Sequence, residues 1–402
     1  MKEVDVLFLL DNNFGNAHDN RVYRALKVFQ QNGFKVAIVC MQHSDLPMEE
    51  TIDGIDIYRM HDAQIMRPHT LFSYRKKLAA NIISKFKFKT VYANDWTMLN
   101  ISTRIKKALP HVIHIYDTHE LLMDYHFDGM DKMPWINQQK AKLWIKYQQY
   151  LESVDIKNTD ISISIAYSVA TLLHFNYRLK QAPYVVRNIP EFGFFNEKLD
   201  DKIVAELDAK LVSLAPNTHH LIFIGDYMHY HNGIEILFNA LTKLPKDVKL
   251  VMVGTNRHKS HFDKIKTDLN IEDRVIELGR YPQKYLMYLK SKVSISVAPT
   301  QDYGFFHNYY SLPNKLFDSI KIGFPLITSS LPEHKLVVDT YKVGESFDAF
   351  NTENGTAELI ELYAKVSNNL AYYQQNVVAT QKEVSVANEF APVIKHLKRL
   401  LK

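Results

Sequence analysis

The stretch HNYYSLPNKLFDSIKIGFP, residues 307–325, determines our interpretation of the fold. It lies between two short apolar runs, VSISVAP at residues 293–299 and LITSS at residues 326–330. Runs of this length and composition, bounded by Pro and Gly, are typical of buried strands. The stretch therefore connects the carboxyl end of one predicted strand to the start of the next.

A helix is predicted inside this connection. Leu316, Phe317 and Ile320 have the spacing of one apolar helix face. Pro313 suits the first helical turn, because proline lacks the N–H group that would be unpaired there. The sequence predicts a loop that rises from a strand and turns into a helix.

The start of this helix carries polar residues suited to an anion. A helix N-terminus offers free N–H groups and positive potential, and Asn314 and Lys315 add to both. A diphosphate would fit there, and Asp318 could accept a hydrogen bond from a hydroxyl of the same ligand. We interpret the segment as a nucleotide-sugar site. The alternative is an ordinary strand–loop–helix unit in which Asn314 and Lys315 only cap the helix and face water.

Strand-like and helix-like segments alternate along almost the whole chain. The expected strands are VDVLFLLD, VAIVC, IDIYRM, VYAND, VIHIYD, ISISI and YVVRN, followed after His219 by LIFIGD, KLVMVG, VIELG, VSISVAP and PLITS. Helices are expected from Asp19, over 72–86 and over 136–152. Continuous apolar strands separated by helices indicate parallel sheets covered on both faces. The sequence predicts two doubly wound α/β domains, 1–187 and 188–384, that bind ligands at the carboxyl ends of their strands, in the cleft between them.

Composition places the chain among ordinary globular proteins. It has 402 residues, 46% hydrophobic and 23% charged, which is enough for two domains. No apolar run approaches the roughly 20 residues of a membrane span, and the N-terminus turns acidic too soon for a signal peptide. The single cysteine, Cys40, cannot pair within the chain, which fits a reducing cytosol and excludes a thiolate cluster.

The net charge of +5 is distributed unevenly. Residues 70–110 contain one acid, Asp95, and nine cations: Arg75, Lys76, Lys77, Lys85, Lys87, Lys89, Arg104, Lys106 and Lys107. Between residues 72 and 86 these cations flank an apolar helical stripe. We expect either a core-facing helix with a solvated basic face, or a face that contacts an anionic membrane or glycan.

Two clusters of polar residues follow strands in the first domain. After the first strand, Gly15 permits a tight loop, and His18 and Arg21 lie near the start of the next helix. The string YDTHELLMDYH follows the strand VIHI and brings His119 and Glu120 to the carboxyl end of a buried strand. Asp117 is interpreted as structural, and Asp95 is assigned to the same rim. The alternative for His18 and Arg21 is capping and packing alone.

These motifs resemble the GT-B glycosyltransferases of the large family 4, or group 1. The resemblance rests on SLPNKLFD…GFP, on the loop around Gly15, on the D-x-H-E-L element, and on FIGDYMHYHNGIEILFNAL. It implies that His119 and Glu120 are catalytic and that Gly15, His18, Arg21 and Asp95 face the acceptor. It also implies that the basic C-terminal helix, residues 385–402, packs back on the first domain. The predicted donor-binding residues are Gly225, Gly254, Arg257, Arg280, Asn308, Tyr310, Ser311, Leu312, Pro313, Asn314, Lys315 and Asp318.

The chain departs from the family pattern at three positions. Asp226 and Asn232 stand where an Arg and a Lys usually meet the diphosphate, so Arg257, Arg280 or Lys315 must replace them. Tyr310 stands where the first of two acids is expected, eight positions before Asp318. No Asp-x-Asp metal clamp is present in the sequence, which favours a site that needs neither metal nor cofactor.

The resemblance implies a cytoplasmic enzyme, at the inner face of a membrane or free of it. It would move a sugar from a nucleotide-diphosphate donor to a glycan or lipid-linked acceptor, with retention of configuration, in bacterial-type surface glycan synthesis. No nucleic-acid partner is expected. Two alternatives stay open: a degenerate partner or sugar-binding subunit, favoured by the missing Arg, Lys and Glu, and a nucleotide-sugar 2-epimerase, which needs clustered acids that we do not find.

Overall fold

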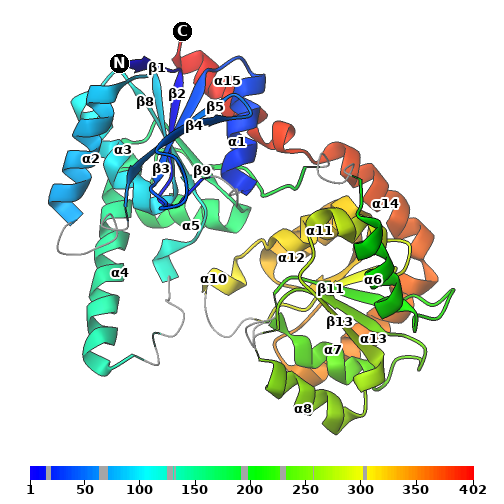
Figure 1. The fold of residues 1–402 in the computed structure, drawn as a ribbon. Coiled ribbons are helices and arrows are strands. Elements are labelled where there is room, and N and C mark those ends of the chain that lie inside the picture. The colour runs from blue at the N-terminus through cyan, green and yellow to red at the C-terminus, as the bar shows by residue number, and fades with distance from the viewer. Residues whose placement is uncertain are drawn as a thin grey trace. The chain divides into compact units, whose positions relative to one another are not determined.

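The chain folds into two compact units, each with its own sheet. The computed structural model describes residues 1–14, 20–62, 71–124, 130, 133–191, 198–226, 232–256, 258–301 and 306–402. The first unit comprises Met1–Arg187 and Val386–Lys402, and the second comprises Asn188–Ser385 (Figure 1). The division after Arg187 coincides with the predicted boundary. Both sheets are mainly parallel, which confirms the predicted α/β class.

The sheet of the first unit has eight strands in the order β10-β9-β8-β7-β2-β3-β5-β4. Every neighbouring pair is parallel except β4 and β5. All residues of β2, β7 and β8 are buried, as expected for strands that helices cover on both faces. Its strands are β2 (Val6–Leu9), β3 (Val36–Met41), β4 (Glu49–Ile52), β5 (Ile55–His61), β7 (Thr90–Asn94), β8 (Ile113–Thr118), β9 (Ile161–Ser164) and β10 (Tyr184–Val185). Strands β1 (Lys2–Glu3) and β6 (Phe86–Lys87) form a separate two-stranded sheet.

The antiparallel edge strand β4 is absent from the sequence-based expectation. It pairs with β5 through a tight turn in which Ile52 lies opposite Ile55. The turn residues Asp53 and Gly54 have φ angles of 51° and 75°, and Asp-Gly is a preferred pair for such hairpin turns. The Asp-Gly dipeptide is the sequence signal for this hairpin. The strand β4 itself is not predicted, because it alternates exposed and half-buried residues instead of forming an apolar run.

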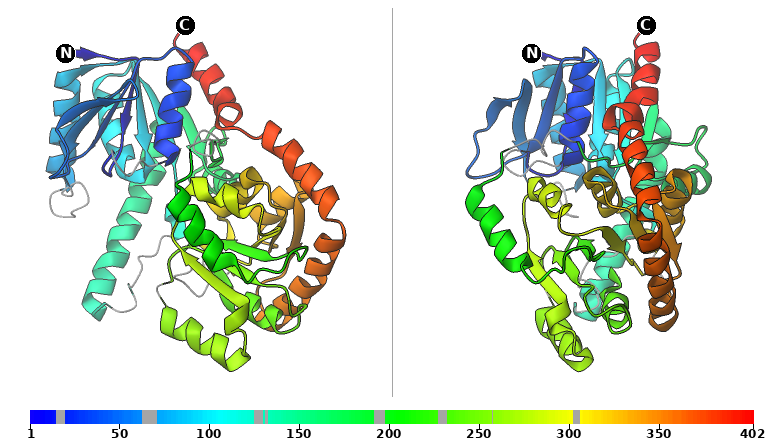
Figure 2. Two further views of the ribbon diagram at one scale, coloured as in Figure 1. Left: turned by 45° about the vertical axis from the view of Figure 1, so that its right-hand side comes forward. Right: turned by 90° about the vertical axis from the view of Figure 1, so that its right-hand side faces the viewer.

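Helices cover both faces of this sheet. In Figures 1 and 2, α1 and α15 lie together on one face and α2 and α3 on the other. The helical segments of the unit are α1 (Asn20–Gln31), α2 (Leu71–Lys85), α3 (Asp95–Ala108), η2 (Leu122–Asp124), α4 (Trp135–Asp155), η4 (Ile156–Asn158), α5 (Tyr167–Tyr177) and α15 (Val386–Leu400).

The C-terminal helix α15 belongs to the first unit. Its Phe390 ring lies 6.1 Å from the ring of Phe29 on α1. Its Glu389 carboxylate accepts hydrogen bonds from the Arg187 guanidinium, the shortest at 2.6 Å from Nη2, and from the Arg187 backbone N–H at 3.0 Å. The chain therefore returns to the first unit, as the resemblance implied.

The second unit has a six-stranded parallel sheet in the order β13-β12-β11-β14-β15-β16. Its strands are β11 (Leu221–Ile224), β12 (Leu250–Val253), β13 (Val275–Gly279), β14 (Ile295–Ala298), β15 (Leu326–Ser329) and β16 (Gly344–Phe347). Its helical segments are α6 (Asp201–Leu211), α7 (Ile234–Leu241), α8 (Lys259–Leu269), η7 (Glu272–Arg274), η8 (Gln283–Tyr285), α9 (Leu286–Leu289), α10 (Phe306–Tyr309), α11 (Asn314–Ile322), α12 (Pro332–Tyr341), α13 (Thr352–Asn368) and α14 (Leu370–Glu383).

Alternating residues of β11 belong to two apolar cores. Leu221 and Phe223 join the cluster formed with α7, α8 and α13, whereas Ile222 and Ile224 join the cluster formed with α6 and α9. Strand side chains point to opposite faces in turn, so this division shows a sheet covered on both sides.

The strand order of each sheet reverses beside one central strand. In the second unit, β12 lies on one side of β11 and β14 on the other. In the first unit, β3 and β7 flank β2 in the same way. Doubly wound sheets bind ligands at the carboxyl end of such a strand. The residues that follow β2 and β11, and those that follow their neighbours, are therefore the first place to look for a site.

Candidate functional site

The helix predicted from the opening stretch is α11. It begins after Pro313, whose backbone is extended and whose side chain makes no cap, and it ends at Gly323 with a φ of 110°. Leu316, Phe317 and Ile320 are buried, as their spacing predicts. Lys315 and Asp318 are half-buried and share another face of the helix, because they are three residues apart.

The Lys315 side chain reaches the region beyond strand β11. Its Nζ lies 3.4 Å from Asn232 Oδ1 and 4.7 Å from the centre of the Phe223 ring. Burial lowers the pKa of the Lys315 amine to about 8. Among the residues that the structure describes, no carboxylate pairs with this amine. Within the described part of the chain, this cation is therefore not balanced by an acid.

Beside Lys315, two glycines bring the ends of β11 and β12 together. Gly225 and Gly254 have φ angles of 128° and 146°, which L side chains rarely adopt. A Cβ on Gly254 would lie 2.1 Å from the carbonyl oxygen of Gly225, and one on Gly225 would lie 3.8 Å from Cε of Lys315. The lack of side chains at these glycines therefore lets the two strand ends pack closely together beside the lysine.

The two positions that lack the expected cations are each contacted by a cation from elsewhere in the unit. Asp226 accepts hydrogen bonds from the Thr255 N–H, at 2.7 Å, and from the guanidinium of Arg280. Burial would raise the pKa of Asp226, but these two donors hold it below its usual value. Arg280 thus approaches the position of the missing arginine, as Lys315 approaches Asn232, the position of the missing lysine.

The other predicted donor-binding residues have varied surroundings. The exposed Asn314 accepts a 2.7 Å hydrogen bond from Asn188 Nδ2, and the Ser311 hydroxyl donates to the Asn308 carbonyl at 2.9 Å. Leu312 is buried. The ring of Tyr310 packs edge-on against Tyr309, with ring centres 4.8 Å apart. Three predicted site residues, Gly15, His18 and Arg257, lie outside the described residues.

In the first unit, Asp117 is the centre of a buried charged cluster at the end of β8. Its carboxylate accepts hydrogen bonds from Arg21 Nη2 at 2.7 Å, Arg21 Nε at 3.2 Å and the Tyr92 hydroxyl at 2.7 Å. Burial would raise the pKa of Asp117, but the Arg21 guanidinium and His119 hold it well below its usual range. Arg21 also donates to the Val186 carbonyl at 2.8 Å.

This arrangement fits the packing alternative that the sequence left open for Arg21. The side chain is buried and its guanidinium is engaged with Asp117 and Val186, so it holds the cluster together. The structural role expected of Asp117 is seen directly. Asp117 also lies beside His119, and sequence spacing does not indicate this contact.

His119 lies at the edge of the cluster. Its Nε2 is 3.6 Å from Asp117 Oδ2, and 18% of its side-chain surface is exposed. Burial would lower the pKa of His119, but the carboxylate of Asp117 more than offsets this, so the pKa lies above its usual value. Glu120 follows it, half-buried, and its backbone carbonyl accepts a 2.9 Å hydrogen bond from the Thr118 hydroxyl. The neighbouring carboxylate thus stabilises the charged form of the imidazole relative to the neutral form.

Asp95 opens α3 next to this cluster. Its backbone has a φ of 63°, and its Oδ1 accepts a 2.9 Å hydrogen bond from the Trp96 N–H. Burial raises the pKa of Asp95 to about 7, with Asp11 and Glu120 adding to the rise and His119 opposing it. Asp11 was not predicted, although its place directly after the first strand was a signal for it.

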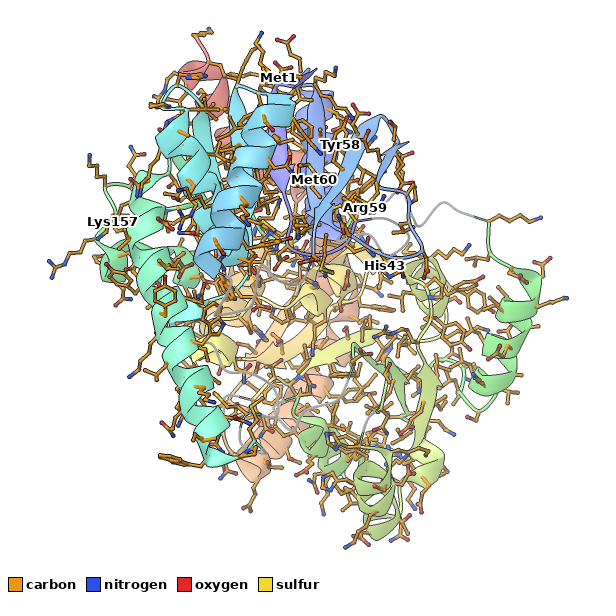
Figure 3. All side chains as sticks on the ribbon, turned by 60° about the vertical axis from the view of Figure 1, so that its left-hand side comes forward. Met1, His43, Tyr58, Arg59, Met60 and Lys157 are labelled. Atoms are coloured by element: carbon orange, nitrogen blue, oxygen red, sulfur yellow. The ribbon has the colours of Figure 1, made fainter. Side chains whose placement is uncertain are left out.

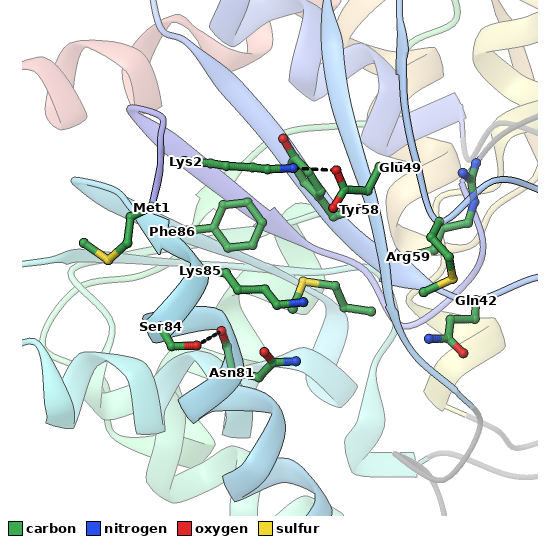
Figure 4. A pocket seen from close by; sticks show the side chains of 12 residues that line it. Met1, Lys2, Gln42, Glu49, Tyr58, Arg59, Asn81, Ser84, Lys85 and Phe86 are labelled. Carbon is green, nitrogen blue, oxygen red and sulfur yellow. Dashed lines mark hydrogen bonds and ion pairs between the residues drawn. The ribbon is translucent and has the colours of Figure 1, made fainter.

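A pocket lies elsewhere in the first unit. Figure 3 labels Tyr58, Arg59 and Met60 of β5 beside it, and Figure 4 shows the pocket from close by. Its volume is about 540 Å³, and it is lined by Met1, Lys2, Gln42, Met48, Glu49, Tyr58, Arg59, Met60, Asn81, Ser84, Lys85 and Phe86. None of these is a predicted site residue. Arg59 donates to the carbonyls of Pro47 and Phe14, so it supports the loop after β2.

Two absences hold for the described part of the chain. No group of three or more His, Cys, Asp or Glu side chains there could hold a metal ion. No described helix has the length and apolar character that crossing a membrane would require.

Comparisons with known proteins agree with the fold and with the second unit. The family model described as "Glycosyl transferases group 1" matches residues 218–365, within the second unit. A search of curated proteins gave no match.

Three solved structures illustrate the match in fold. Sucrose-phosphate synthase from Thermosynechococcus elongatus has a TM-score of 0.70 at 13% identity, covering 98% of this chain and 99% of that one. Anabaena Alr3699/HepE in complex with UDP has a TM-score of 0.70 at 13% identity, covering 98% and 100%. The E. coli structure titled trehalose-6-phosphate, bound with UDP-2-fluoro glucose, has a TM-score of 0.69 at 10% identity, covering 98% and 99%. These structures confirm the predicted fold, and the family model confirms the predicted resemblance over residues 218–365.

Proposed function

We propose that this chain, which has the GT-B fold and a second unit of the group 1 type, transfers a sugar from a nucleoside diphosphate sugar to an acceptor hydroxyl. The observation that carries the proposal is Lys315. Its amine sits beside bare glycine backbone, with no described carboxylate to neutralise it. A cation kept in this state suits a ligand that brings its own negative charge.

The second unit would hold the donor. The diphosphate gains negative charge as the bond to the sugar breaks, and preorganised positive groups stabilise that charge. Lys315, Arg280 and the positive N-terminal end of α11 can supply them without a metal ion. Asp318 shares a face of α11 with Lys315 and would accept a hydrogen bond from the ribose. Because two of the matched structures contain UDP or a UDP sugar, uridine donors are the first to test.

The first unit would act on the sugar and the acceptor. The imidazole of His119, which lies 3.6 Å from the Asp117 carboxylate, would donate a hydrogen bond to an oxygen that gains charge in the transition state. Glu120, the next residue, would bind hydroxyl groups of the sugar or the acceptor. Retention of configuration follows from the family resemblance and is part of the proposal.

We extend the proposal to a glycan or lipid-linked acceptor in surface glycan synthesis, at the cytoplasmic face of a membrane. The basic helix α2 was one candidate for membrane contact. Its apolar residues Leu78, Ala79 and Ile82 are buried, which supports the alternative of a core-facing helix, whereas Lys76 and Lys77 are exposed. An apolar membrane contact therefore needs another surface.

A panel of nucleotide sugars tests the proposal. We expect binding heat with at least one donor, and release of the free nucleoside diphosphate when donor and acceptor are both present. Binding without release, whatever acceptor is supplied, would instead favour a sugar-binding subunit that has lost its activity. Asp226 and Asn232 are the observations that favour this second candidate.

A further inference from the structure

Helix α4 turns a polar face inward and an apolar face outward. Its buried residues are Ile145, Gln148, Glu152 and Asp155, three of which are polar. Its exposed large apolar residues include Ile136, Leu143, Tyr150 and Val154, with 58%, 68%, 63% and 40% of their surface exposed. The usual amphipathic arrangement of a surface helix is thus reversed.

The four exposed residues form one continuous stripe, which we name the α4 stripe. They are separated by seven, seven and four positions, and a helix of 3.6 residues per turn brings such positions onto one face. Trp135, which is 72% exposed, lies at its edge. No residue of α4 before Ile145 is buried.

The buried face fixes this orientation. The Glu152 carboxylate accepts hydrogen bonds from the hydroxyls of Tyr116, at 2.6 Å, and Tyr177, at 2.7 Å. Asp155 accepts a 2.7 Å hydrogen bond from Asn100. Rolling the helix to bury the stripe would strip these carboxylates of their donors, which is costly for buried acids. The stripe is therefore a stable surface of the folded unit.

The exposed charged residues of α4 itself are all lysines. Lys140, Lys142 and Lys146 are exposed on α4, and the sequence from Met133 to Leu151 contains no Asp or Glu. On a helical projection, Lys140 and Lys146 lie on opposite sides of the stripe. Lys157, just beyond α4, points outward in Figure 3. An apolar face with aromatic residues, bordered by lysines, has the chemistry of helices that lie in the surface of anionic bilayers.

We propose that the α4 stripe docks on an anionic lipid surface, with α4 lying in the interface and its lysines on the headgroups. The inference deepens the proposed function, because it names the surface on which a lipid-linked acceptor would be met. A second copy of the chain is disfavoured as the occupant, because a symmetric contact through this face would set the lysine rows of both copies against each other.

Vesicle co-sedimentation of the full chain tests the proposal. We expect binding to vesicles of phosphatidylglycerol and phosphatidylcholine in equal parts, about tenfold or more tighter than to pure phosphatidylcholine, and weakened by salt. Ile136→Gln, Leu143→Gln and Tyr150→Gln together should reduce binding by about tenfold or more. Lys140→Gln with Lys146→Gln should act in the same direction.

Matched variants in the second unit serve as controls. Val212→Gln, Tyr372→Gln and Val378→Gln remove three other exposed apolar side chains, and Lys243→Gln with Lys246→Gln removes two other exposed cations. Both controls should bind vesicles like the wild type. The fluorescence emission of Trp135 should shift to the blue when vesicles are added. Trp135→Phe should remove that shift. A surface that docks on a soluble protein instead of lipid would show no shift on adding vesicles.

Two results would overturn the inference. One is a stripe variant that sediments with anionic vesicles as well as the wild type. The other is a wild-type dimer that the stripe variant converts to a monomer, with no vesicle binding by either, which assigns the stripe to a second copy. Release of nucleoside diphosphate with a short soluble acceptor should be unchanged in the stripe variant. If the wild type releases no nucleoside diphosphate, that result counts against the proposed transferase activity and leaves the proposal for the stripe unaffected.

Discussion

The charged clusters of the two units differ in how their charges are balanced. Around Asp117, the carboxylate accepts hydrogen bonds from Arg21 and Tyr92 and lies beside His119, so its negative charge is paired within the unit. Around Lys315, an amine lies next to an amide and bare backbone, with no carboxylate partner among the described residues. The first cluster pairs its carboxylate inside the protein, whereas we propose that the amine of the second pairs with an anionic ligand.

A second lysine of the same helix sharpens this comparison. Lys321 is more deeply buried than Lys315, and burial lowers the pKa of its amine to about 8 as well. Its amine donates to the carbonyls of Gln381, at 3.0 Å, and Val384. A depressed lysine pKa therefore does not mark a binding site. The useful difference is whether the donors of the amine are already engaged by the protein.

The largest expected effect concerns His119. His119→Ala should lower turnover by about a hundredfold or more, because a positioned hydrogen-bond donor is lost in the transition state. Donor binding should be retained, and Tm should stay within a few degrees. Turnover and thermal unfolding of the same preparation provide the measurement.

His114 is the matched control for this prediction. It is fully buried on β8, with its ring nitrogens close to Ser102 Oγ at 2.7 Å and the Asn158 carbonyl at 3.3 Å. His114→Ala should lower Tm instead. If His119→Ala lost stability and kept its turnover, His119 would be a packing residue like His114.

The next effect concerns the diphosphate. Lys315→Ala should weaken nucleoside diphosphate binding by about 1.5–3 kcal/mol, the size of a charge-assisted hydrogen bond. Lys321→Ala should leave affinity unchanged and lower the free energy of unfolding, because two buried carbonyls lose their donor. Calorimetric titration and urea unfolding of both variants check the pair. Equal affinities for wild type and Lys315→Ala would refute the donor assignment.

A pH series gives a smaller effect. The pKa of Lys315 is lowered to about 8, so the amine loses its proton as pH rises through 8. Affinity for UDP should be level from about pH 7 to pH 8 and fall by up to about tenfold per pH unit above that. Lys315→Arg keeps its charge and should flatten the profile. An unchanged slope in that variant would exclude Lys315 as the titrating group.

The same titration affects stability with the opposite sign. Between pH 8 and the ordinary lysine pKa of 10.5, the unfolded chain binds more protons at Lys315 than the folded chain does. The stability contribution of Lys315 should therefore rise with pH while diphosphate affinity falls. The urea unfolding of wild type, compared with Lys315→Met over this range, separates the two effects.

The smallest effect concerns Asp95, whose pKa is raised to about 7 from the ordinary 3.8. Its folded-state contribution to stability is full below pH 3.8 and is lost as pH rises through 7. Asp95→Asn should therefore gain a few degrees in Tm over the wild type at about pH 8, and less at about pH 5. The exposed Asp201→Asn in the second unit is the control and should show no such trend. A constant Tm difference across the range would contradict the assignment.

The sequence predicted the architecture because the relevant signals are local. Apolar runs for strands, helical spacing for α11 and the polar residues that follow β7 and β8 are all properties of neighbouring residues. In parallel sheets, the carboxyl ends of the strands lie at one edge, so the candidate residues near His119 could be grouped before their contacts were known. The edge strand β4 was missed because its signal was a turn dipeptide rather than an apolar run.

Contacts between distant residues could not be predicted in this way. The sequence showed Asp226 and Asn232 in place of two cations, but not that Arg280 and Lys315 approach them. It suggested Arg21 for the acceptor, whereas the fold engages its guanidinium with Asp117. It drew attention to the basic helix α2, while the outward apolar stripe belongs to α4.

The sequence by itself determined two doubly wound units, their boundary near Arg187, and the segments that contain the candidate site. Only the tertiary structure decided which charges meet a partner and which face of a helix is buried. The reason is physical: strand and helix patterns depend on the spacing of residues along the chain, whereas the state of a charge depends on the atoms packed around it, such as Asp117 beside His119 and Asn232 beside Lys315.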